Sequence, residues 1–303
     1  MKSAAYFAPV LFLSLTGCEQ LTATVSGVSV LMRTHELAAA DGMPTALVVA
    51  LGSNLTGLTD SGATGAFAVA GDRGSVTNTS GFEAVSGANV KVEWLQKRAI
   101  LCEASAQRGT YQGTSVDGAC GGHALEYAEN AEYQTVIDAS TDTYRLYVTA
   151  PAPVAPSQVA FLPTPTAPSD HYGAAMKEHA RGSALTVDWS AAGSDRPAFV
   201  TLFRVRFTGS SSDPLSALSS SSWSADSQNP IFDNFPQGPA DYFDLLVGDP
   251  DTSVVIPGAA FEVTGLYVVV VTPTEVSREV TTNLALGSGA LAGAGTAFAF
   301  WVD

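Results

Sequence analysis

Hydrophobic and polar residues alternate along most of the chain with a period of two, which is the pattern of a strand with one buried face. In 89–94, for example, Val90, Val92 and Trp94 alternate with polar residues. Gly, Asn, Asp and Ser separate such segments at short intervals. We therefore expect many short strands joined by turns, in an all-β fold built from β-sandwiches. The predicted strands are 24–32, 46–51, 66–70, 89–94, 133–137, 143–148, 185–189, 199–205, 242–247, 265–271 and 296–302.

Two stretches depart from that pattern. Residues 171–181 have a modest helix-like spacing, and we predict a short helix there. Residues 284–302 carry no charge, so a transmembrane helix with Gly289 and Gly293 on its packing face is one interpretation. Four glycines interrupt this stretch and 298–302 has the composition of a strand, so we expect two buried strands joined by a glycine turn.

A proline-rich segment divides the chain. Residues 151–168 hold six prolines, which favour extended, semi-rigid backbone and exclude a central strand. Strand patterns lie on both sides of this segment, and 303 residues are enough for two domains that each have a core. We predict a first β-sandwich domain over 24–150, a linker over 151–168 and a second β-sandwich domain over 169–303.

The N-terminus has the pattern of an export signal. A basic start at Lys2 is followed by an apolar run over 4–15 and by small residues before Cys18. The apolar run is too short for a membrane-spanning helix, which needs about 20 residues. The segment Leu15-Thr16-Gly17-Cys18 resembles the lipobox of bacterial lipoproteins.

That resemblance implies a processing route and a location. Residues 1–17 would be a cleaved signal peptide, Cys18 would carry the lipid, and 18–23 would form a tether. Two or three acyl chains hold a protein stably on a membrane, whereas one holds it only marginally. Glu19 follows the cysteine in place of the Asp that enterobacterial sorting reads as inner-membrane retention. The resemblance therefore implies an outer-membrane anchor in the bacterial cell envelope, on its periplasmic or surface face.

The remaining cysteines fit an exported protein. The chain has three cysteines, so lipidation of Cys18 leaves Cys102 and Cys120. One pair in an oxidising compartment predicts a disulfide, which would close a loop of 17 intervening residues. A reactive thiol or a metal site are the alternatives, although neither cysteine lies in a C-x-x-C motif and only His123 is near Cys120.

Charge excludes several partners. The formal net charge is −15, and no cluster of Lys or Arg offsets it locally, so the surface repels the phosphate backbone of nucleic acids. No glycine-rich loop ends in Gly-Lys-Ser/Thr, so nucleotide binding is not predicted. The 46% of hydrophobic residues with only 14% of charged residues excludes wholesale disorder.

We find no catalytic motif. The segment 113–117 lacks the final Gly of a G-x-S-x-G elbow, and Ser-x-x-Lys does not occur. His171 and His179 would lie about 12 Å apart along the predicted helix, too far for one metal ion. No metal is therefore predicted; solvated loop acids remain the main interpretation, with calcium as the alternative for Asp241, Asp244, Asp249 and Asp251, which crowd one stretch together with Asp233.

Both predicted domains resemble known scaffolds. Residues 86–92, followed by 109–111 and 143–148, resemble the carboxypeptidase regulatory-like, transthyretin-type sandwiches of bacterial envelope proteins. Residues 185–189 resemble the B strand of fibronectin type III or Ig-like domains, and Phe261 with Tyr267 resembles their tyrosine corner and F strand. These resemblances imply scaffolds that bind or space other molecules.

The predicted function is therefore a non-catalytic, lipid-anchored envelope protein that serves as a binding or spacer module for a protein or glycan partner. The alternative is an exported hydrolase or carbohydrate-active enzyme on a β scaffold, and a third possibility is a small-ligand or metal-binding accessory protein. A deep pocket with convergent polar groups would favour the enzyme, whereas an exposed patch would favour the binding module.

The Ser-rich segment 209–227, with Trp223 inside it, is expected to be a surface loop.

Overall fold

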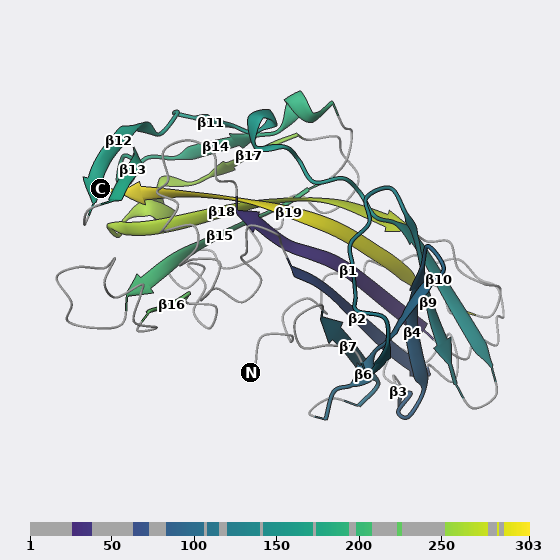
Figure 1. Cartoon of the computed structure of the whole chain (residues 1–303). Coiled ribbons are helices and arrows are strands. Elements are labelled where there is room, and N and C mark those ends of the chain that lie inside the picture. The colour runs from purple at the N-terminus through teal and green to yellow at the C-terminus, as the bar shows by residue number, and fades with distance from the viewer. Residues whose placement is uncertain are drawn as a thin grey trace, which may run out of the picture. The chain divides into compact units, whose positions relative to one another are not determined.

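The computed structural model describes residues 26–37, 63–72, 83–105, 108–114, 120–139, 142–171, 174–193, 198–207, 223–225, 252–277, 284 and 288–303. In these residues the regular structure consists of β-strands and short 3-10 turns, without an α-helix, so the predicted all-β class is confirmed (Figure 1). The described part of the chain contains no helix with the length and hydropathy needed to cross a membrane.

The described residues fall into two compact units. Unit 1 takes its residues from Met1–Arg33, Thr64–Ala152 and Glu275–Gly293, and unit 2 from Thr34–Ala63, Pro153–Thr274 and Ala294–Asp303. The strands β18 (Gly265–Ser277) and β19 (Gly289–Val302) each contribute residues to both units.

A five-stranded antiparallel sheet forms one layer of unit 1, in the order β10-β9-β4-β5-β8. Its strands β10, β9 and β4 are labelled in Figure 1. Its strands are β4 (Asn89–Trp94), β5 (Lys97–Ile100), β8 (Gly121–Gly122), β9 (Glu132–Asp138) and β10 (Thr143–Thr149). The second layer has the order β19-β1-β2-β7-β6, with β3 beside β2. Its other strands are β1 (Ser26–Leu37), β2 (Ala63–Asp72), β3 (Glu83–Ala84), β6 (Cys102–Glu103) and β7 (Thr110–Thr114).

The inward positions of both layers form the core of unit 1. Trp94 of β4 and Tyr133 of β9 stack with ring centroids 5.7 Å apart, and small alanines of β2 belong to the same buried cluster. A buried hydrogen bond between the hydroxyls of Ser29 and Thr135 joins β1 to β9. Buried and outward positions alternate along the strands of the five-stranded sheet, so its polar residues lie on the face away from the core.

Unit 2 also has two layers around one core. The three-stranded layer has the order β11-β14-β17, formed by β11 (Ala160–Leu162), β14 (Leu185–Asp188) and β17 (Ser253–Ile256). The other layer has the order β16-β15-β18-β19, which adds β15 (Ala198–Phe207) and β16 (Trp223–Ala225). Both layers contribute to the buried cluster that includes Trp189, Phe261, Tyr267 and Phe300.

The helix predicted over 171–181 is wrong. The segment is part of a hairpin of β12 (Thr166–His171) and β13 (Ala174–His179), and the end of β13 pairs in parallel with Trp301 and Val302 (Figure 1). Pairing with a strand distant in the sequence outweighs the local helix propensity of Ala, Met, Lys and Glu.

Gly289–Val302 is one continuous strand, so Gly293 and Gly295 do not form the predicted turn; Leu284 lies in a β-bridge, and 285–287, with Gly287, lie outside the described residues. The first nine residues of the strand are buried, and small residues suit a strand that is covered on both faces. A Cβ atom at Gly289 would lie 3.0 Å from the carbonyl oxygen of Ser277.

Most other predicted strands correspond to observed ones, and β4 has the predicted bounds. The predicted strands 46–51 and 242–247 lie outside the described residues.

Candidate functional site

The candidate site is an open hollow of about 550 Å³ on the five-stranded sheet of unit 1, at the end of the β4–β5 hairpin. Most of its polar lining comes from outward positions of the strands, because the inward positions are filled by the core. The lining residues are Glu93, Trp94, Leu95, Gln96, Lys97, Arg98, His123, Glu132, Gln134 and Tyr147.

Strand register aligns part of this lining into a transverse row. Tyr147 of β10 pairs with Gln134 of β9, Gln134 pairs with Glu93 of β4, and Glu93 pairs with Arg98 of β5. His123 follows directly after the next strand, β8, and its N–H donates to the carbonyl oxygen of Arg98 at 2.7 Å. Four steps between neighbouring strands give the row a length of about 19 Å. We call these five residues the polar row.

Hydrogen bonds orient one end of the polar row. The side-chain amide of Gln134 donates to the Tyr147 hydroxyl at 2.6 Å, which leaves the Gln134 amide oxygen as an acceptor. Beneath the row, the Tyr133 hydroxyl donates to the carbonyl oxygen of Glu126 at 2.6 Å and accepts from the N–H of Ala128 at 2.7 Å. Burial raises the pKa of Tyr133 to about 12, so this support stays protonated at neutral pH.

The charges of the hollow are balanced. Its lining includes two carboxylates, Glu93 and Glu132, and two cations, Lys97 and Arg98. The Lys97 ammonium pairs with Glu126 at 2.6 Å, whereas no carboxylate of the described residues lies within ion-pair distance of Arg98. This balance contrasts with the net charge of −15 of the whole chain.

The turn at the rim of the hollow is strained. Leu95 and Gln96 connect β4 to β5 with φ angles of 41° and 65°, in the left-handed region. Two-residue hairpins of this geometry favour Asn-Gly, since side chains with a Cβ atom pay for positive φ. The Leu95 side chain is also 67% exposed. Backbone strain of this kind is concentrated at ligand sites, so the turn beside the hollow is a candidate contact for a ligand.

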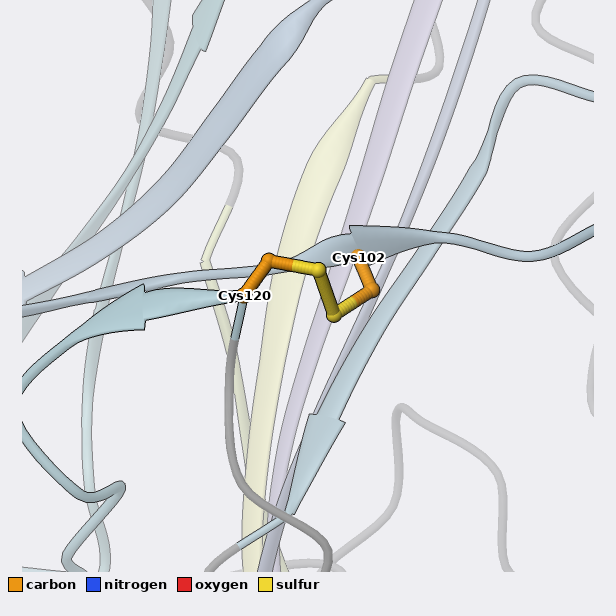
Figure 2. Close-up of a disulfide and its surroundings, with 2 residues drawn as sticks. All are labelled: Cys102 and Cys120. Atoms are coloured by element: carbon orange, nitrogen blue, oxygen red, sulfur yellow. A yellow bond between two sulfur atoms is a disulfide. The ribbon is translucent and has the colours of Figure 1, made fainter.

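The predicted disulfide is present between Cys102 and Cys120, with Cα atoms 5.2 Å apart (Figure 2). It joins β6 of one layer of unit 1 to the residue that precedes β8 in the other layer. The Cys120 N–H also donates to the carbonyl oxygen of Ile100 at 2.8 Å. The crosslink thereby holds β8 beside β5, close to the His123 end of the polar row.

Most other predicted site residues cannot be placed relative to this hollow. Cys18 and the whole signal segment lie outside the described residues, as do Asp241, Asp244, Asp249 and Asp251, the calcium alternative. In unit 2, His179 is buried against Phe261 and Phe300, and its Nε2 lies 2.8 Å from the carbonyl oxygen of Ser183. Among the residues that the structure describes, no group of three His, Cys, Asp or Glu side chains could hold a metal ion.

Sequence reasoning missed the polar row, although part of its signal was visible. The outward positions of three well-predicted strands include planar polar or aromatic residues, among them Glu93, Gln134 and Tyr147. Their alignment depends on the register between strands, which alternation alone does not specify.

Comparison with known proteins adds no relative: no family model matches the chain, and no curated protein or solved structure shows significant similarity to it.

Proposed function

We propose that this chain is a lipid-anchored protein of the bacterial cell envelope that acts as a non-catalytic binding or spacer module for a protein or glycan partner. The observation that carries the proposal is the use of the cysteines. The chain has three, and two of them form the Cys102–Cys120 disulfide, which leaves Cys18 in its Leu-Thr-Gly-Cys segment for lipid. Disulfides persist in oxidising compartments, which supports export. Glu19 after the cysteine supports an outer-membrane destination.

We further propose that unit 2 is an Ig-like sandwich. The order β11-β14-β17 corresponds to strands A, B and E of such domains, and β15-β18-β19 corresponds to C, F and G. The Tyr267 hydroxyl donates to the carbonyl oxygen of Val263 at 2.7 Å, which is the bond of a tyrosine corner. This agreement supports the Ig-like scaffold as a display module.

For unit 1 we propose a transthyretin-type sandwich. Its two layers enclose one buried cluster, and the residues that carry the resemblance form β4, β7 and β10. The hollow is open and takes its lining from four strands, the β4–β5 turn and His123, an arrangement that suits contact with an extended ligand better than enclosure of a reacting bond.

Metabolic labelling of the full chain with palmitate tests the anchor. We expect label in the outer-membrane fraction of the wild type and none in Cys18→Ala, whereas the Cys102→Ala/Cys120→Ala variant should keep its label. An unlabelled wild type would overturn the lipid anchor. Turnover of a glycan by the purified protein, measured as new reducing ends, would overturn the non-catalytic assignment and favour the hydrolase.

A further inference from the structure

The polar row and the hairpin tip beside it form a ligand site on the outward face of the five-stranded sheet. We propose that this site binds an uncharged, extended oligosaccharide whose chain runs across the strands from Tyr147 to His123. The proposal rests on the binding role proposed above and assigns it a location and a ligand chemistry.

The hydrogen-bonding groups of the row match a polyhydroxyl ligand. Glu93, Arg98 and Gln134 each end in a planar group with two polar atoms that can engage two neighbouring groups of a ligand. Adjacent sugar hydroxyls both donate and accept, so they need donors and acceptors side by side. The row supplies donors from Arg98 and acceptors from Glu93 and the free amide oxygen of Gln134.

Charge argues for an uncharged ligand. The lining carries two carboxylates, Glu93 and Glu132, and two cations, of which Lys97 is already paired with Glu126, so no strong charge of either sign is left to attract a polyanion or a polycation. The surrounding protein, with a net charge of −15, repels anionic polymers at longer range. A neutral glycan meets neither obstacle.

Apolar groups complete the match. The Tyr147 ring is held by the hydrogen bond from Gln134, and the faces of sugar rings carry C–H groups that pack on aromatic rings. Leu95 offers a second apolar surface at the rim, where it is 67% exposed. The polar row spans about 19 Å, which is long enough for several linked sugars rather than one.

A protein partner fits the same surface less well. An added peptide strand pairs with the backbone along the free edge of a sheet, whereas the polar row runs across the strands on the face of one. The centre of a protein interface is enriched in apolar and aromatic residues and depleted of charge, whereas Glu93 and Arg98 lie side by side in this row.

Binding of defined polysaccharides by the full-length protein, purified in detergent, tests the proposal. The neutral probes are dextran, mannan and chitin oligosaccharides, with polygalacturonate as the anionic probe, measured by calorimetry. We expect at least one neutral probe to bind, and Tyr147→Ala and Arg98→Ala each to weaken it about tenfold. Tyr147→Phe keeps the ring and should lose less.

Matched controls separate the site from general effects. Thr143→Ala alters an outward residue of the same strand as Tyr147, away from the hollow, and Arg108→Ala removes an exposed arginine elsewhere in unit 1. Both should bind as the wild type does, and thermal unfolding should show that all variants are folded. The proposal is overturned if no neutral probe binds, if the Tyr147 and Arg98 variants bind normally, or if polygalacturonate binds best.

A photo-crosslinking residue placed at Gln96 and activated in cells distinguishes the proposed glycan ligand from the more general binding role. Protein adducts without glycan binding would overturn the glycan ligand and leave the binding role intact. Neither adducts nor glycan binding would count against the binding role itself, while palmitate labelling tests the anchor independently.

Discussion

Replacing the hairpin tip should stabilise unit 1 and weaken its ligand binding at the same time. Leu95 and Gln96 hold φ angles of 41° and 65°, and a left-handed conformation costs a non-glycine residue roughly 1–2 kcal/mol. Leu95→Asn with Gln96→Gly introduces the dipeptide that this turn prefers. The added glycine lowers the free energy of unfolding by about 0.5–1 kcal/mol, because glycine has a larger entropy in the unfolded chain.

The balance gives a net stabilisation of about 1–2 kcal/mol. Removal of Leu95 itself costs little, since burial of a whole Leu side chain contributes about 1.5–3 kcal/mol and 67% of this one is exposed. Urea unfolding, followed by tryptophan fluorescence, measures the change as a higher midpoint at an unchanged slope. A gain of 1 kcal/mol corresponds to a rise in Tm of about 2–4 °C in a unit of this size.

Asn130 provides the control, because it also has a positive φ, of 60°, but asparagine tolerates this conformation. Asn130→Gly should therefore gain no stability, because little strain is relieved and the glycine costs about 0.5–1 kcal/mol through its larger entropy in the unfolded chain. A midpoint that falls or stays the same in the Leu95→Asn/Gln96→Gly variant would refute the strain. If the strain is kept for function, the stabilised variant should also bind its glycan more weakly.

Three further predictions concern other parts of the structure. Gly258→Ala should destabilise unit 2 by about 2 kcal/mol or more in urea unfolding, because its Cβ would overlap the backbone carbonyl of Gly182; wild-type stability would contradict this packing. Cys102→Ala/Cys120→Ala should lose roughly 3 kcal/mol, measured in the same way, and no loss would show that the crosslink does not restrict the unfolded chain. The pKa of Tyr133 is raised by burial from 10.0 to about 12, so its stabilising contribution is complete below pH 10 and is lost as the pH rises toward 12. In a spectrophotometric titration of the wild type, Tyr133 should ionise near pH 12 and not in the transition near pH 10, and Tyr133→Phe should lack this late step. A variant that titrates identically to the wild type would refute the assignment.

The sequence predicts elements well where the information is local. Strict alternation predicts β4 to the residue, and counting cysteines predicts the Cys102–Cys120 pair. The segment Ala174–His179 fails because its residues favour helix locally, while its strand partner, at Trp301 and Val302, is far away in the chain.

The candidate site shows a second limit. Glu93, Gln134 and Tyr147 are each recognisable as outward residues of a strand, but nothing local states that they lie opposite one another. Register depends on how whole strands pair, and a shift by one residue would send each of these side chains into the core. The strained turn is similarly hidden, because Leu-Gln is not a turn sequence and only the tight connection between β4 and β5 imposes its conformation.

The disulfide also determines how the protein can be studied on living cells. With Cys102 and Cys120 oxidised, and with Cys18 lipidated as we propose, the chain of three cysteines would offer no thiol to a maleimide. A cysteine introduced at the exposed Gln96 would then be a unique chemical handle beside the hollow. Reaction of intact cells with a membrane-impermeant maleimide would place the hollow on the outer surface. Reaction only after the outer membrane is opened would place it in the periplasm, and so decide which glycans it can meet.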